Sequence, residues 1–306
     1  MVNKLTKRKL KLFVSYDLWK VIIVSALACL VFLLAFNFVA RKPTDGQDFK
    51  ILIDKNAIMG EDVDGFFENL FTKSATEGGF SYEMLKGETV MINGTDENPD
   101  EYLIRSVYGD LHYDDVVILQ EPLYEYYFKT CYMAADISEY INSAIEFVSI
   151  NACDESGEIN EQKVYDYFDR TRKGDSRFRT KAEKEQGRKD ELDRFKGILL
   201  MATELRACFI ANPELLDKER EYTYYGGEAK KGVFGLRLGA LVGRSDRDIS
   251  KLFGLKKYKE GTNEIYYSAD GLYLAIGNNV QENGDLYYEM LAVMYTLIDT
   301  YTTLLD

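Results

Sequence analysis

An unbroken apolar run near the N-terminus constrains this chain more than any other feature. Residues 21–40, VIIVSALACLVFLLAFNFVA, are apolar except at Ser25 and Asn37. An α-helix rises about 1.5 Å per residue, so about 20 apolar residues cross a hydrocarbon core roughly 30 Å thick. The run therefore predicts a transmembrane helix over residues 21–40, with membrane lipid as its partner.

Two other interpretations of this run stay open. A secretory signal has an apolar core of about 7–15 residues followed by small residues at a cleavage site, whereas this core is longer and ends in the bulky residues 36–39. A lipoprotein signal would end at Cys29, and the small Ala28 before it suits that interpretation. However, Ala26 occupies the place of an expected leucine, and a long, mostly apolar stretch follows Cys29. The length of the run favours a retained helix.

The charges around the apolar run predict its orientation. Residues 1–42 contain eight basic side chains and one acidic side chain, and six of the basic residues precede the run. Because positive charge is retained on the cytoplasmic side, residues 1–20 should form a basic cytoplasmic tail. We expect a single-pass bacterial cell-membrane protein, with residues 41–47 as a stalk and residues 48–306 outside.

The exterior part is strongly acidic. The whole chain has a net charge of −13 and residues 1–42 carry +7, which leaves −20 on residues 43–306. Phosphates are repelled by such a charge, so no nucleic-acid partner is expected. Three exterior cysteines, Cys131, Cys153 and Cys208, do not make a disulfide framework. Both a Cys131–Cys153 pair and buried free thiols are compatible with the sequence.

The residues available for catalysis or metal binding are few. His112 is the only histidine, which excludes a zinc site of several histidines. Residues 152–163, ACDESGEINEQK, resemble a calcium loop, but Ala152 and Lys163 occupy the positions of its required acidic ligands. This stretch predicts an acidic turn before a helix. We expect no metal, no cofactor and no enzymatic activity.

The pattern of the exterior part predicts an α/β fold. FKILI (49–53) and DVVIL (115–119) are short apolar runs, and the second is typical of a strand buried on both faces of a parallel sheet. FSYEMLKGETVMI (80–92) predicts two short strands or a hairpin, and residues 264–277 predict a hairpin with Asp270-Gly271 as its turn. Helical spacing is found in residues 61–74, 100–112, 138–149, 162–171, 181–212 and from Asp285 onward.

Three segments resemble the type II extracellular solute-binding proteins of ABC transporters. They are DDVVILQEPLYEYYFKTCYMAADISEYI (114–141), KGVFGL (231–236) and LYLAIGNNVQENGDLYYEML (272–291). The resemblance implies a two-lobed, periplasmic-binding-protein-like ectodomain over residues 48–306. Lobe 1 would comprise residues 48–119 and a C-terminal return, and lobe 2 would comprise about residues 120–230.

Candidate ligand-binding residues follow from the predicted sheet. In open α/β sheets, ligands bind beyond the carboxyl ends of the strands. Polar residues follow the first strand and DVVIL, and a further group precedes the glycine-rich stretch 230–243. The candidates are Asp54, Asn56, Gln120, Glu121, Tyr224, Tyr225 and Glu228. The alternative is that Asp54 and Glu121 cap helices or face solvent.

Two functions remain as hypotheses. The first is a non-catalytic accessory subunit of a membrane complex, whose partners are membrane transporter subunits of the ABC type. The second is a binding protein that delivers a small solute or a peptide to a transporter or sensor. An exposed apolar patch outside the membrane would favour the first hypothesis. A convergent polar pocket would favour the second.

Overall fold

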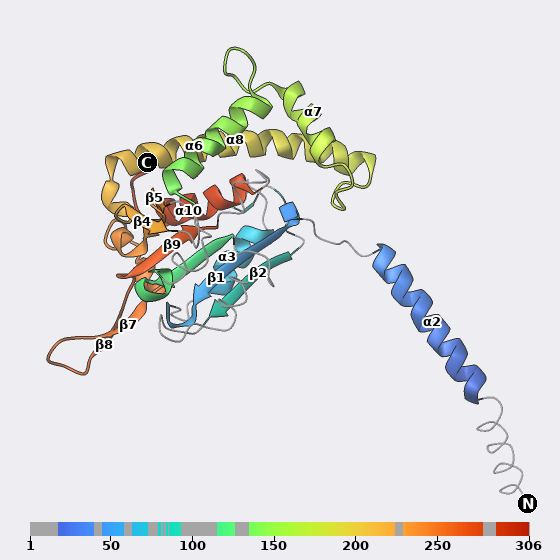
Figure 1. The fold of residues 1–306 in the computed structure, drawn as a ribbon, viewed down its shortest axis with the longest axis horizontal. Coiled ribbons are helices and arrows are strands. Elements are labelled where there is room, and N and C mark those ends of the chain that lie inside the picture. The colour runs from blue at the N-terminus through green and yellow to red at the C-terminus, as the bar shows by residue number, and fades with distance from the viewer. Residues whose placement is uncertain are drawn as a thin grey trace, which may run out of the picture. The chain divides into compact units, whose positions relative to one another are not determined.

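The structure is a computed structural model that describes residues 18–39, 45–57, 63–72, 79–80, 82, 84, 86–92, 115–125, 135–223, 229–277 and 286–305. Two compact units are present, Met1–Lys42 and Pro43–Asp306 (Figure 1). The basic tail up to residue 17 lies outside the described residues. So do the predicted helix 100–112, His112 and Cys131.

The first unit contains helix α2 (Leu18–Val39), which is 22 residues long. The predicted helix is therefore present. The side chains of α2 are described over residues 18–34, and nearly all of them are exposed. Among the described residues, no helix has both the length and the hydropathy required to cross a membrane.

A five-stranded mixed sheet organises the second unit, in the order β2-β1-β3-β9-β6. Strands β2 (Lys86–Ile92), β1 (Asp48–Asp54) and β3 (Val116–Gln120) are parallel. Strand β9 (Leu272–Ile276) is antiparallel to both of its neighbours, β3 and β6 (Gly235–Arg237). The predicted α/β class is confirmed, and the runs FKILI and DVVIL form the adjacent strands β1 and β3.

The two faces of the sheet carry separate apolar clusters. Ile51 and Ile53 of β1 belong to the larger cluster, and Leu52 belongs to the smaller one on the opposite face. This alternation follows from the period of two in a strand. Because both faces are covered, residues 51–53 of β1 and 116–119 of β3 are uninterrupted apolar runs, which is the pattern that predicted them.

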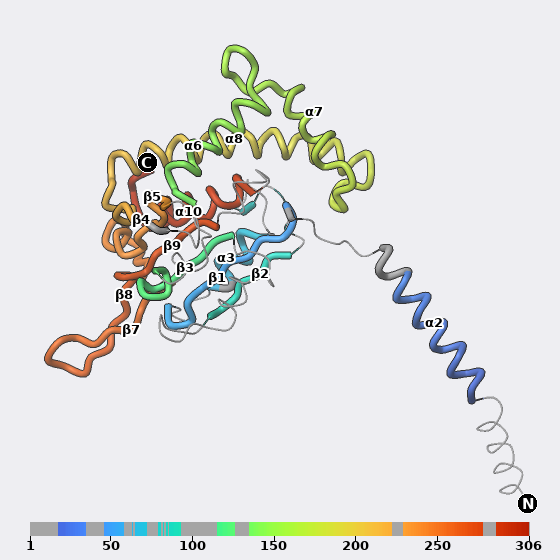
Figure 2. The backbone as a smooth tube through the Cα atoms, in the orientation of Figure 1, coloured from blue at the N-terminus to red at the C-terminus, as the bar shows by residue number. Residues whose placement is uncertain are grey.

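Helices cover the face of the larger cluster. They are α3 (Val63–Thr72), α6 (Ile137–Ala152), α7 (Glu161–Thr171), α8 (Lys181–Ala211) and α10 (Tyr287–Tyr301). Figure 2 shows the long α8 running alongside α6 and α7. One continuous core joins the sheet to α3, α6, α8 and α10. The smaller cluster is covered by a helical turn over residues 121–125 and by Phe234.

Local sequence signals fix the ends of these helices. Thr180 and Glu183 form a capping box at the start of α8, in which each side chain bonds the backbone N–H of the other residue. Asp136 caps α6 through a bond from the Glu139 N–H, and its other carboxylate oxygen accepts from the Val233 N–H at 2.6 Å. The segments 114–141 and 231–236 therefore contact one another at Asp136.

Smaller elements connect the sheet and the helices. Two two-stranded antiparallel sheets pair β4 (Arg220–Thr223) with β5 (Ala229–Gly232) and β7 (Leu255–Tyr258) with β8 (Ile265–Ser268). The short 3-10 helices are η2 (Asp45–Gln47), η3 (Lys55–Ala57), η5 (Pro213–Leu215), η6 (Leu238–Leu241) and η7 (Ile249–Lys251).

The predicted hairpin over residues 264–277 is wrong. Gly271 has a φ of 86° and the chain turns there, as the Asp-Gly pair indicates. However, β8 pairs with β7, whereas β9 pairs with β3 and β6. In residues 80–92, β2 is the strand among the described positions, and it pairs in parallel with β1. A hairpin pairing of this stretch is therefore not formed there.

The acidic turn before a helix is confirmed. Residues 153–160 link α6 to α7, and Asp154 accepts bonds from the backbone N–H groups of Ser156 and Glu158. The Lys163 ammonium donates to the Cys153 carbonyl oxygen at 2.5 Å. Cys153 and Cys208 are buried free thiols.

Candidate functional site

The carboxyl ends of β1 and β3 meet at one edge of the sheet, as predicted. The parallel register pairs Ile53 with Ile118. Asp54 and Gln120, the last residues of the two strands, therefore lie close together. Asn56 lies in η3, immediately after β1. The structure therefore brings Asp54, Asn56 and Gln120 together.

Asp54 is the buried centre of this edge, with no exposed surface. Its Oδ1 accepts a hydrogen bond from the Asn56 N–H at 2.9 Å. Its Oδ2 has no hydrogen-bond partner among the described residues. Burial raises the pKa of the Asp54 carboxyl, and the amide groups of Asn56 and Gln120 oppose that rise only in part.

Glu121 points to a different cluster. Its N–H donates to the Gly271 carbonyl oxygen at 3.0 Å, which attaches the turn 121–125 to the start of β9. Its carboxylate lies 3.5 Å from Nη2 of Arg220, at the start of β4. Glu121 is exposed, as the alternative interpretation expected, and it contacts Arg220 instead of joining Asp54 in a shared ligand set.

Arg220 is the centre of that second cluster, and the sequence did not indicate it. Its guanidinium pairs with Glu125 at 2.7 Å and with Asp217. It also lies 5.3 Å from the ring centre of Tyr124 and 5.8 Å from that of Tyr273, and these two rings stack at 4.5 Å. Arginine over an aromatic face is a favourable arrangement. Among the described residues, one cation thus contacts three carboxylates.

The remaining predicted residues, Tyr224, Tyr225 and Glu228, lie outside the described residues, between β4 and β5. The predicted site is therefore described at four positions. Three of them converge at Asp54, and the fourth joins Arg220.

No family model, curated protein or solved structure matches the chain. In the part of the chain that the structure describes, no group of three or more His, Cys, Asp or Glu side chains is arranged to hold a metal ion.

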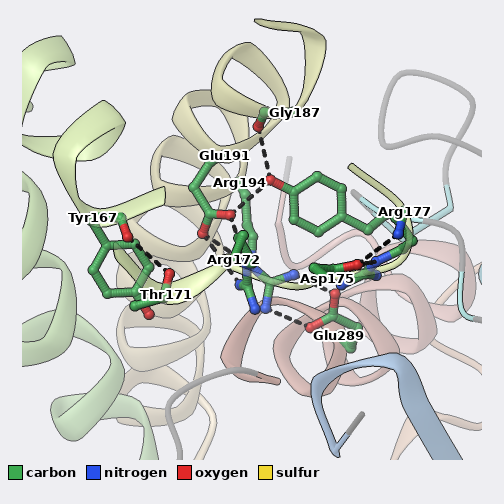
Figure 3. Close-up of polar contacts among 10 residues, drawn as sticks. Tyr167, Thr171, Arg172, Asp175, Arg177, Gly187, Glu191, Arg194 and Glu289 are labelled. Carbon is green, nitrogen blue, oxygen red and sulfur yellow. Dashed lines mark hydrogen bonds and ion pairs between the residues drawn. The ribbon is translucent and has the colours of Figure 1, made fainter. Parts of the chain in front are cut away.

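A buried ionic network is the largest charged feature that sequence reasoning missed (Figure 3). Arg194 of α8 and Glu289 of α10 form a bidentate pair, with Nη2 and Oε2 2.8 Å apart. Glu191 lies one turn earlier in α8, with its carboxylate 3.3 Å from Nε of Arg172 and 3.9 Å from Nε of Arg194. These side chains are almost completely buried, so their charges are compensated inside the domain.

Tyr82 lies among the arginines of this network. Its hydroxyl donates to Glu191 Oε2 at 2.7 Å and lies 2.9 Å from the Gly187 carbonyl oxygen. The guanidinium groups of Arg172, Arg177 and Arg194 are 5.0–5.8 Å from its ring centre. Arg177 is in turn held by Asp175 at 2.9 Å. The network therefore joins four separate stretches of the chain.

The network sets the ionisation of its members. Burial alone would raise the pKa of Glu191, but the charges of Arg172 and Arg194 outweigh it and lower that pKa. Burial, followed by the neighbouring Glu191 charge, raises the pKa of Tyr82 well above its usual value. The carboxylate is thus held ionised and the phenol neutral, as the hydrogen bond between them requires.

A hollow of about 220 Å³ lies between α6 and α8. None of the predicted site residues lines it. Its walls are Ser138, Ile141, Asn142, Arg206, Phe209, Ile210 and Leu216.

Proposed function

We propose that this protein is a membrane-tethered accessory subunit that acts outside the cytoplasm through protein contacts, without catalysis. Its partners would be the membrane subunits of a transporter of the ABC type. The observation that carries this proposal is the internal engagement of the predicted ligand residues. Glu121 is paired with Arg220, and Asn56 and Gln120 are turned to Asp54. These contacts stabilise the fold, which supports a function through protein contacts.

The tether rests on α2 and on its flanking charges. The 22 residues of α2 rise about 33 Å, which matches a hydrocarbon core of roughly 30 Å in length. The proposal rests on this length and on the apolar sequence 21–40, although no described helix combines the length and the hydropathy of a membrane span. The excess of lysine and arginine before it favours a cytoplasmic N-terminus and an exterior domain. Protease added to intact cells should therefore digest a tag at the C-terminus and spare a tag at the N-terminus.

The two-lobed division is part of the proposal. Helices α6, α7 and α8 fall within the proposed second lobe, residues 120–230, and pack against one another. The strands of the first lobe and of its C-terminal return, β1, β2, β3 and β9, share one sheet.

The experiment that tests the proposal is purification of the full-length chain from native membranes in mild detergent. We expect it to migrate as a complex larger than the chain alone, with co-purifying membrane subunits in a constant ratio. A chain that migrates alone at every detergent concentration would overturn the accessory-subunit proposal.

A second candidate function, solute or peptide binding, is favoured by one observation: Oδ2 of Asp54 has no hydrogen-bond partner in the part of the chain that the structure describes. A buried acceptor without a hydrogen bond is costly, and a cationic or hydrogen-bonding ligand would satisfy it. Thermal unfolding of residues 43–306 with peptides, sugars, polyamines and divalent cations separates the two functions. A ligand at 100 times its dissociation constant adds about 2.7 kcal/mol of stability. If the protein is an accessory subunit, we expect no ligand to raise the unfolding temperature in a saturable way, or we expect a rise that Asp54→Asn leaves unchanged.

A further inference from the structure

The β7–β8 hairpin presents an exposed apolar face to its surroundings. Its register pairs Lys256 with Tyr267 and Tyr258 with Ile265. Because directly paired residues point to the same side of a sheet, these four side chains share one face. The exposed fractions are 62 % for Tyr258, 46 % for Ile265 and 43 % for Tyr267. Figure 2 shows the hairpin projecting beyond the sheet and helices of the second unit.

The base of the hairpin is firmly attached to the domain. Leu255, on the opposite face, packs against the main core, and Ser268 is buried. The Gly254 N–H donates to the Ala57 carbonyl oxygen at 2.9 Å, and the Ala269 N–H donates to Oγ of Ser250 at 3.2 Å. An isolated two-stranded hairpin is marginally stable, so these contacts at its base maintain the exposed face.

The composition of this face is that of a protein interface. Tyrosine is enriched among the residues that dominate binding energy at protein interfaces, and lysine is depleted there. The single lysine of the face is not isolated, since Nζ of Lys256 lies 5.5 Å from the ring centre of Tyr258. The face is therefore an aromatic and aliphatic surface with one cation at its edge.

Charge indicates the chemistry of the partner. Residues 251–264 contain four lysines and two glutamates, a net charge of +2, within a unit whose net charge is −20. This segment is a basic island on an acidic protein. Complementarity of charge across an interface directs association and sets its orientation. A partner surface edged by carboxylates fits this island.

The tip of the hairpin argues for a protein and against a lipid surface. Residues 259–264, KEGTNE, are all exposed, and Lys259 pairs with Glu264 at 3.3 Å. In a segment that inserts into a membrane, apolar and aromatic residues occupy the part that enters the lipid. Here an approach from the tip would place two carboxylates, Glu260 and Glu264, against the headgroups, while the apolar residues remain on the side of the hairpin.

We infer that the face formed by Lys256, Tyr258, Ile265 and Tyr267 docks into an apolar groove, edged by carboxylates, on a second, different protein. This inference rests on the proposed function, because it names the surface through which the accessory subunit binds its partner. The contact is lateral, with the polar tip left in solvent.

Site-specific photo-crosslinking in the full-length chain tests this docking face. Benzoylphenylalanine is introduced at Tyr267, and at Leu200 of α8, which is 55 % exposed, as the control position. Irradiation of intact cells should give one protein adduct from position 267 and not from position 200. The peptide of the partner at the crosslink should be rich in Asp and Glu. Added salt should lower the yield.

Variants at neighbouring positions make the test specific. Tyr258→Ala and Lys256→Glu, each combined with the crosslinker at position 267, should lower the adduct yield by about tenfold or more, since few residues carry most of the energy of an interface. Lys181→Glu, at a fully accessible position of α8, should leave the yield unchanged. Thermal unfolding of each variant should match that of the parent, because the altered side chains are exposed.

Each other outcome overturns the inference. An adduct with lipid, an adduct with a second copy of the chain, no adduct at all, or equal yields from all variants would each exclude this docking face. The proposed function has its own readout in the native complex. A complex that persists while the hairpin variants leave it intact would overturn the docking face and leave the proposed function standing.

Discussion

Asp54 and Glu289 are both fully buried carboxylates, yet their surroundings differ in kind. Glu289 shares both oxygens with the Arg194 guanidinium, so its charge is compensated where it lies. Among the described residues, Asp54 has only the neutral amide groups of Asn56 and Gln120 beside it, and its Oδ2 has no hydrogen-bond partner. Burial of a charge without such compensation is unfavourable. Removal of the charge should therefore stabilise the domain at Asp54 and destabilise it at Glu289.

For Asp54, replacement by asparagine should stabilise the domain at neutral pH by about 1 kcal/mol. The raised pKa means that the folded state holds its proton after the unfolded chain has released its own near pH 3.8. Stability is therefore lost as pH rises from 3.8 through the folded pKa, and it stays lower above that pKa. Urea unfolding of residues 43–306 at pH 4 and pH 7 measures the difference. An Asp54→Asn variant that is less stable at pH 7 would contradict this account.

For Glu289, replacement by glutamine should destabilise the domain by about 3 kcal/mol, because it leaves Arg194 buried with reduced compensation. The matched control is Asp169→Asn, which removes an exposed partner of Arg188 and should cost less than about 1 kcal/mol. Urea unfolding at pH 7 compares the two variants. If both variants lost the same free energy of unfolding, burial would not determine how much these ion pairs contribute to stability.

Helix α8 contains a glycine, Gly187, at which helix propensity favours alanine and side-chain packing opposes it. Alanine favours a helix interior over glycine by about 1 kcal/mol. At Gly187, however, a Cβ would lie 2.7 Å from the rings of both Phe168 and Phe178. Overpacking of this kind costs about 1–3 kcal/mol, so Gly187→Ala should destabilise the domain. Thr203→Ala, at an exposed position of the same helix, should stay within about 0.5 kcal/mol of the parent in thermal unfolding.

The same helix shows which elements a sequence can predict. Local signals mark both ends of α8, the Thr180 capping box and the cap at Asn212, and the predicted range 181–212 agrees with Lys181–Ala211. The Asp270-Gly271 turn is also local, and the chain does turn there. The partner of a strand is not a local property, so β8 and β9 were wrongly paired with one another. The uninterrupted burial of LYLAI, against the exposure of IYY, is what assigns β9 to the central sheet.

The candidate site also contains residues that local sequence patterns predict and residues that they do not. Asp54 and Gln120 were predicted because the ends of adjacent parallel strands meet at one edge. Arg194 and Glu289 are 95 residues apart, as are Glu125 and Arg220. No periodicity within a helix or strand connects such positions, so their pairing appears only when these elements pack together.

For the whole molecule, the excess of negative charge opposes compaction. A net charge of −20 on residues 43–306 produces self-repulsion that salt screens over a Debye length of about 8 Å at 0.15 M. The midpoint of thermal unfolding should therefore rise by a few degrees between 0.02 and 0.3 M NaCl. The difference between the parent and Glu289→Gln should stay constant over that range, because the Arg194 pair is buried. A midpoint that falls with salt would contradict a dominant self-repulsion.

The place of β9 between β3 and β6 governs when the domain can be completed during synthesis. About 150 residues separate β3 from β9 along the chain. At a synthesis rate of about 5–20 residues per second, β3 waits roughly 8–30 s for its neighbour. Throughout that interval the apolar strand VVILQ has an unpaired edge, which is a template for pairing with other chains. A nascent chain is thus most vulnerable to aggregation in the interval before its last tenth has emerged.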